Sequence, residues 1–122
     1  MRVGSGVSML LSLLPVFAAT AGCHSYHVET TVENHAGEPI KLLEVDYPSA
    51  SFGADSLAVG AELHYRIQLQ GSGPIKVQYT ARDGRLRQVV GPTLAERQEG
   101  RLEILLLPDG KAEFHPALTP QP

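Results

Sequence analysis

The stretch Glu62-Leu63-His64-Tyr65-Arg66-Ile67-Gln68-Leu69-Gln70 alternates apolar and polar side chains residue by residue. Successive side chains of a β-strand point to opposite faces, so this alternation predicts a strand with one face in a core and the other in water. Residues 75–81 repeat the pattern, and so do residues 27–34. Because the period is two in all three stretches, the sequence predicts an all-β fold.

Turn-forming residues separate these stretches. Asp83-Gly84 and Asp109-Gly110 are Asp-Gly pairs, which favour tight hairpins between antiparallel strands. Gly71-Ser72-Gly73-Pro74 and residues 34–39 also interrupt the alternation. The resulting strands are expected at 26–34, 40–47, 51–57, 62–70, 75–81, 86–90 and 101–107, with an eighth compatible with 111–115. Residues 94–98 are the one stretch that suggests a helical turn.

Short strands joined by tight turns favour an antiparallel β-sandwich of about 7–8 strands. The turn Leu57-Ala58-Val59-Gly60, together with the strand it opens, resembles a turn found in immunoglobulin-like and fibronectin type III-like domains. Val59 stands where those families usually have Pro, and the core Trp and inter-sheet cysteine pair of immunoglobulin domains are missing from the sequence. The resemblance therefore implies a two-sheet sandwich and leaves the strand order open.

The first 22 residues have the layout of a secretory signal. Arg2 supplies a positive charge, an apolar stretch follows from about Val7 to Ala19, and small residues close the segment. The apolar stretch is shorter than the roughly 20 residues that a membrane-spanning helix needs, and Pro15 interrupts it. We therefore expect a cleaved signal peptide over residues 1–22.

Cys23 is the one cysteine of the chain, so it has no partner for an internal disulfide. The run Thr20-Ala21-Gly22-Cys23 resembles the lipobox of bacterial lipoproteins, although Thr20 replaces the usual aliphatic residue. The resemblance implies that Cys23 receives a diacylglycerol, carries acyl chains such as palmitate, and becomes the mature N-terminus. The alternative is ordinary cleavage after Ala21, which would release a soluble secreted or periplasmic protein beginning at Gly22.

The lipoprotein resemblance also implies a location. Because His24 and not Asp follows the cysteine, resemblance to sorting in Gram-negative lipoproteins implies the outer membrane, facing the periplasm. The expected organisation is a signal peptide at 1–22, a lipidated N-terminus and tether at 23–26, a sandwich at 27–115 and a Pro-rich extended tail at 116–122. Removing Arg2 with the leader leaves 9 basic and 13 acidic side chains, a net charge of −4, which argues against nucleic-acid binding.

Catalytic and metal-binding patterns are weak in this sequence. Gly71-Ser72-Gly73 lacks the spacing of a nucleophile elbow, and Asp46 and Asp55 flank a loop in which a turn role is favoured. His24 and His27 have a spacing that metal ligands use, but no second cysteine can help complete a tetrahedral site. We expect no catalytic residues, no metal and no cofactor, which makes an enzyme the least favoured class.

Three arginines form the one surface cluster whose chemistry suggests a binding role. Arg82, Arg85 and Arg87 gather at the predicted hairpin around Asp83-Gly84, on an otherwise acidic domain. Their guanidinium groups suit either anionic headgroups or the carboxylates of a protein partner, with an ordinary solvated hairpin tip as the alternative.

The expected function follows from the anchor and the small β domain. We expect a lipid-anchored cell-envelope protein that acts as a non-catalytic binding or scaffolding module and has an envelope protein as partner. The alternative is a secreted sandwich that binds a small ligand or a glycan. Tyr47, Tyr65 and Tyr79 fall on apolar strand faces, so we expect them in the core and not on a glycan-binding platform.

Overall fold

The computed structural model describes residues 24–120. Cys23, the expected signal peptide at 1–22 and residues 121–122 lie outside the described residues. Between residues 24 and 120 the chain forms eight β-strands and one 3-10 turn, η1 (Pro108–Gly110). The strands are β1 (Val28–Asn34), β2 (Ile40–Tyr47), β3 (Ala50–Leu57), β4 (Glu62–Ile67), β5 (Gly73–Thr80), β6 (Leu86–Leu94), β7 (Glu99–Leu107) and β8 (Lys111–Thr119).

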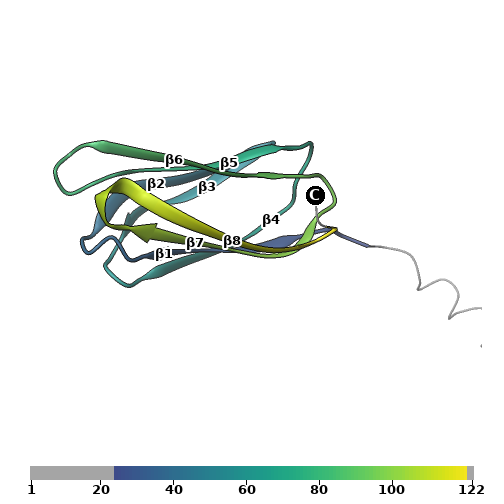
Figure 1. The fold of residues 1–122 in the computed structure, drawn as a ribbon, viewed down its shortest axis with the longest axis horizontal. Coiled ribbons are helices and arrows are strands. Elements are labelled where there is room, and N and C mark those ends of the chain that lie inside the picture. The colour runs from purple at the N-terminus through teal and green to yellow at the C-terminus, as the bar shows by residue number, and fades with distance from the viewer. Residues whose placement is uncertain (1–23, 121–122) are drawn as a thin grey trace, which may run out of the picture.

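The strands form a sandwich of two four-stranded sheets (Figure 1). One sheet has the order β4-β1-β7-β8 and the other β3-β2-β5-β6. All neighbouring strands are antiparallel except β1 and β7, which run parallel. The predicted all-β sandwich of about 7–8 short strands is therefore confirmed. Immunoglobulin constant domains place their first two strands in one sheet, whereas β1 and β2 lie in different sheets here, so the likeness is at the level of the sandwich.

The core lies between the two sheets and follows from the period-two alternation. In β1, β5 and β7 every second side chain is buried. The largest completely buried side chains are mostly aliphatic, and each contributes about 1.5–3 kcal/mol by leaving water. They include Ile40, Ile67, Ile75, Leu94, Leu102, Ile104 and Leu106. Within residues 24–120, every buried side-chain nitrogen or oxygen has a hydrogen-bond partner.

The expected helical turn at residues 94–98 is wrong, because this segment is a tight turn between β6 and β7. The Gln98 backbone N–H donates to the Ala95 carbonyl at 3.2 Å, and the Ala95 N–H donates to Gln98 Oε1 at 2.8 Å. The Gln98 amide is itself buried and donates from Nε2 to the Pro120 carbonyl at 2.9 Å. Gln98 therefore fixes the turn through its side chain, which no helix-forming tendency of the sequence could indicate.

The sequence predicts the end of the domain at residue 115, but β8 continues to Thr119. Leu118 is buried against the core, and residues 116–119 pair with β7 up to Glu99. Pro116 has no N–H for a sheet ladder, yet β8 is the edge strand of its sheet and has a partner on one side alone. An edge strand tolerates proline where its nitrogen faces away from the neighbouring strand, which explains why these residues are not a free tail.

The strand directions give the sandwich two distinct ends. Residues 24–27, Pro120 and the turns at 48–49, 68–72 and 95–98 lie at one end, which we call the proximal end. The loops at 35–39, 58–61, 81–85 and 108–110 lie at the opposite end, which we call the distal end. In Figure 1 the hairpin between β5 and β6 is at the left, and the start of β1 and the marked C-terminal end are at the right.

Candidate functional site

The arginine cluster lies on the distal turn between β5 and β6. Two hydrogen bonds close this turn, from the Ala81 N–H to the Arg85 carbonyl and from the Gly84 N–H to the Ala81 carbonyl, each at 2.9 Å. Gly84 has a φ of 83°, a left-handed conformation that glycine adopts without strain. The Arg85 N–H also donates to Asp83 Oδ1 at 2.9 Å. The predicted Asp-Gly hairpin is thus present, and its backbone is well fixed.

The three arginines differ in their surroundings. The Arg85 side chain is 77% exposed and lies 3.9 Å from Asp83, whereas Arg87 is 34% exposed and lies 3.7 Å from the same carboxylate. The aliphatic part of Arg87 packs over Gly110, since a Cβ added there would lie 3.0 Å from Arg87 Cδ. Arg82 is exposed and forms no ion pair with the residues that the structure describes. Arg82 and Arg85 therefore present charge at the tip, while Arg87 folds back onto the neighbouring turn.

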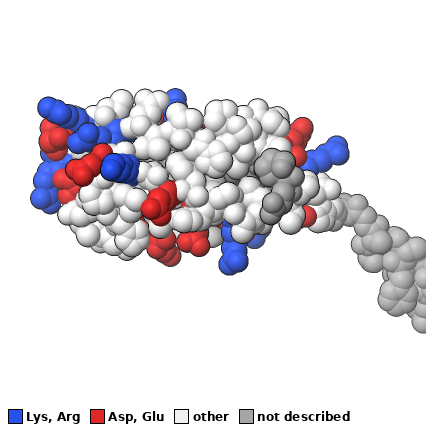
Figure 2. Space-filling view, viewed as in Figure 1, with Lys and Arg blue, Asp and Glu red and all other residues white. Residues whose placement is uncertain are grey.

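A hollow of about 410 Å³ lies beside this tip, on the outer side of the β3-β2-β5-β6 sheet. Its lining is Pro39, Lys41, Thr80, Ala81, Arg82 and Gly84. Lys41 pairs across the sheet with Thr80, and Thr80 pairs with Leu86, so these side chains form one row on the outer face. Figure 2 shows Lys and Arg side chains gathered with Asp and Glu at the left, where the distal turns lie.

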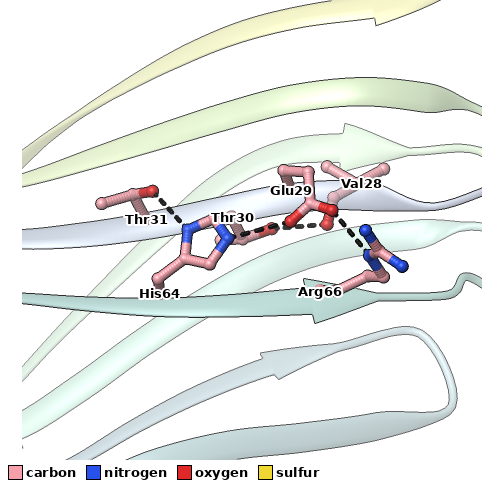
Figure 3. Close-up of polar contacts among 6 residues, drawn as sticks. All are labelled: Val28, Glu29, Thr30, Thr31, His64 and Arg66. Atoms are coloured by element: carbon pink, nitrogen blue, oxygen red, sulfur yellow. Dashed lines mark hydrogen bonds and ion pairs between the residues drawn. The ribbon is translucent and has the colours of Figure 1, made fainter.

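A second polar cluster lies on the outer face of the other sheet and joins β1 to the edge strand β4 (Figure 3). Arg66 Nε donates to Glu29 Oε1 at 2.6 Å, and His64 Nε2 lies 2.9 Å from Glu29 Oε2. His64 Nδ1 lies 3.1 Å from the hydroxyl oxygen of Thr31. When Nε2–H donates to Glu29, Nδ1 of neutral His64 accepts a hydrogen bond from the Thr31 hydroxyl.

The hydroxyl of Thr31, the imidazole of His64 and the carboxylate of Glu29 form one hydrogen-bonded series, an order that nucleophilic enzymes also use. The His64 side chain is 59% exposed, however, so water competes with each of its hydrogen bonds. The Arg66 hydrogen bond, with a contribution from His64, holds the pKa of Glu29 below its usual range and keeps the carboxylate charged. These exposed hydrogen bonds therefore serve to hold the edge strand β4 against β1.

The other candidate residues of the sequence do not converge. His24 Nε2 lies 3.2 Å from Glu99 Oε1 and its ring is edge-on to Tyr26, while His27 directly precedes β1. Among the residues described, no group of three or more His, Cys, Asp or Glu side chains could hold a metal ion.

The serine and aspartates that flank loops have local partners. Ser72 accepts a hydrogen bond from the Glu96 N–H at 3.2 Å, which ties two proximal turns together. Asp46 lies 3.9 Å from Lys76 on β5, and its neighbour on β3 is Ser51. Asp55 lies further along β3, so the two aspartates do not share a site.

The tyrosines behave as expected with one exception. Tyr79 is completely buried and Tyr47 is half-buried against the core. Tyr65 is exposed and stacks on Phe52 with ring centroids 4.7 Å apart and an interplanar angle of 15°. The prediction that Tyr65 is a core residue is wrong because β4 is an edge strand, so its inward side chains lie at the open side of the sandwich.

Comparison with known proteins bears on the fold. No protein-family model matches the chain, and no curated protein matches it. A solved structure described as "NMR structure of the protein from Eubacterium rectale" is similar with a TM-score of 0.55 at 13% sequence identity. The match covers 83% of this chain and 97% of that chain, so it supports the sandwich architecture alone. Over residues 24–120, no helix has the length and apolar character to cross a membrane.

Proposed function

We propose that this protein is a bacterial lipoprotein of the cell envelope, in which lipidated Cys23 anchors a non-catalytic β-sandwich that binds or scaffolds another envelope protein. The observation that carries the proposal is the sole cysteine of the chain, which directly follows an apolar leader and a run of small residues. Acyl chains stabilise membrane residence by about 0.8 kcal/mol per buried methylene, and two or more chains make the anchor lasting.

The short tether supports one orientation of the domain. Four residues, 24–27, separate the anchor Cys23 from β1, and the five residue steps from Cys23 to Val28 reach about 17 Å when fully extended. The proximal end therefore faces the membrane in this proposal. A strand of nine residues is about 30 Å long, so an upright sandwich carries its distal turns about that much further out. Surface charges are screened over about 8 Å at physiological salt, which favours a protein partner over headgroups for Arg82 and Arg85.

The experiment is fractionation of cells that express the full chain or the Cys23→Ala variant. The expected result is wild-type protein in the outer membrane, retained after a high-salt wash, and folded variant protein in the soluble fraction or still fused to its leader in the inner membrane. A matched control, His24→Asp, keeps the cysteine and should move the protein to the inner membrane. Wild-type protein in the soluble periplasm would refute the anchor.

A further inference from the structure

We infer that the distal end carries a docking surface for an acidic segment of a partner protein, a segment that also contains apolar side chains. We call it the distal surface and define it by Lys41, Leu42, Arg82, Arg85 and Leu86. The inference deepens the proposed function and rests on it for the orientation of the domain, but the surface itself is a property of the sandwich. Three features of the distal surface support this inference: its charge, its exposed apolar side chains and the backbone conformation of Leu42.

Charge separates the distal end from the rest of the domain. The two segments around the distal surface, 35–41 and 81–87, contain four Lys or Arg residues and two Asp or Glu residues, so this side of the distal end is positive, whereas Glu33 and Glu62 lie at the distal ends of β1 and β4 in the other sheet. The chain after the leader has a net charge of −4, which leaves the remaining surface clearly acidic. On the far sheet face four glutamates, Glu29, Glu33, Glu62 and Glu103, outnumber the single arginine, Arg101, in the lining of a hollow of about 270 Å³, which His64 also lines. An acidic partner segment is therefore attracted to the distal end and repelled by that face.

The cations of the distal surface are available to a partner. Lys41 and Arg82 both line the 410 Å³ hollow, and neither forms an ion pair with another residue in the described part of the chain. Arg85 keeps a 3.9 Å contact to Asp83, a distance at which an exposed pair is weak. Guanidinium groups bind carboxylates through two parallel hydrogen bonds, so Arg82 and Arg85 suit Asp or Glu side chains.

Two exposed leucines lie beside these cations. Leu42 is 65% exposed and follows Lys41, while Leu86 is 62% exposed and ends the row that begins at Lys41. Two large aliphatic side chains next to a cationic hollow suit a segment that has both carboxylates and apolar residues. In the proposed orientation the distal end lies far beyond one screening length from the membrane, which favours a protein segment over lipid headgroups as the occupant.

The exposed Leu42 has a strained backbone conformation. Leu42 has a φ of 52°, in the left-handed region that a bulky residue rarely adopts, and it lies where the pairing of β2 with β5 shifts register between Lys41 and Glu44. A glycine would remove this strain, yet the position carries an exposed leucine. Strained backbone is concentrated at functional sites, and here it displays an apolar side chain beside Lys41.

The test measures fluorescence anisotropy of a short fluorescein-labelled peptide of alternating glutamate and leucine. The full-length protein is held in nanodiscs of phosphatidylcholine at about 0.15 M salt. The expected result is saturable binding that Arg82→Glu weakens about tenfold or more. Arg97→Glu makes the same charge change on an exposed turn of the proximal end and should leave the affinity within about twofold. Leu42→Gly relieves the positive φ, so it should keep the fold and still weaken binding several-fold.

Each contrary outcome overturns the inference. Absence of binding, equal losses in Arg82→Glu and Arg97→Glu, or unchanged affinity in Leu42→Gly would each show that the distal surface does not recognise such a segment. Loss of peptide binding in phosphatidylglycerol nanodiscs would show that anionic headgroups occupy the arginines. If the chain proves unlipidated, the same measurement is made on the soluble protein, so failure of the anchor and failure of the surface are distinguishable.

Discussion

Asn34 holds the distal end together, and its replacement gives a sharp prediction. The residue is completely buried, and Nδ2 donates to three carbonyl oxygens: Glu38 at 2.8 Å, Leu57 at 3.0 Å and Ala58 at 3.2 Å. Its Oδ1 accepts a hydrogen bond from the Ala36 N–H at 2.9 Å. One side chain therefore joins the loop after β1 to the loop after β3.

The magnitude follows from these contacts. The amide has two N–H hydrogens and one oxygen in use, so Asn34→Ala removes about three hydrogen bonds worth about 1 kcal/mol each. The expected loss is about 3 kcal/mol, or a drop in Tm of about 12–24 °C for a domain of this size. Asn34→Asp replaces Nδ2 with a carboxylate oxygen that faces three carbonyl oxygens, so it should destabilise more than Asn34→Ala.

The assay is urea unfolding followed by circular dichroism, with the slope of unfolding free energy against urea checked for constancy. Gln88→Ala, on the exposed outer face of β6, serves as the control and should stay within about 0.5 kcal/mol of wild type. Two results would contradict this role of Asn34. One is an unfolding free energy of Asn34→Asp equal to that of Asn34→Ala, and the other is an Asn34→Ala variant within about 1 kcal/mol of wild type.

Two further predictions concern the sheet faces. Arg66 lowers the pKa of Glu29, so the charged carboxylate stabilises the fold above its unfolded pKa, and this contribution is lost as pH falls through the lower folded pKa. Glu29→Gln should therefore lower the urea midpoint at neutral pH, and the deficit should vanish only once the pH is below the lowered pKa of Glu29. An equal deficit at neutral pH and at that acidic pH would contradict the role of the charged carboxylate. Gly91→Ala puts a Cβ 2.6 Å from Phe114 and 2.8 Å from Ile75, so it should cost about 1–3 kcal/mol in thermal unfolding. Phe114→Leu in the same chain should recover part of that loss, whereas a neutral Gly91→Ala would show that the two sheets are less tightly packed there.

Local patterns in the sequence predicted the strands well. The expected strands at 40–47 and 101–107 match β2 and nearly all of β7, because alternation and Asp-Gly turns depend on neighbouring residues. The end of β8 was missed because Pro116 reads as a strand breaker unless the strand is known to lie at an edge. Gln98 was missed for a similar reason, since its partner Pro120 is distant in sequence.

The distal surface could not be predicted in full from the sequence, because it is formed by residues that are distant along the chain. The arginine hairpin was recognised as a cluster, but its position opposite the start of β1 follows from the strand order, which the sequence left open. Leu42-Leu43 does carry a signal, because two adjacent apolar residues break the alternation where β2 has its bulge. That signal indicates a bulge, while the exposure of Leu42 and the hollow that Lys41 shares with Arg82 become clear only with the sheet assembled.

Intact mass spectrometry of the protein extracted from membranes determines whether Cys23 is lipidated. We expect a chain that begins at Cys23 and carries the added mass of a diacylglyceryl group or of three acyl chains. An unmodified chain that begins at Gly22 would contradict the proposed anchor.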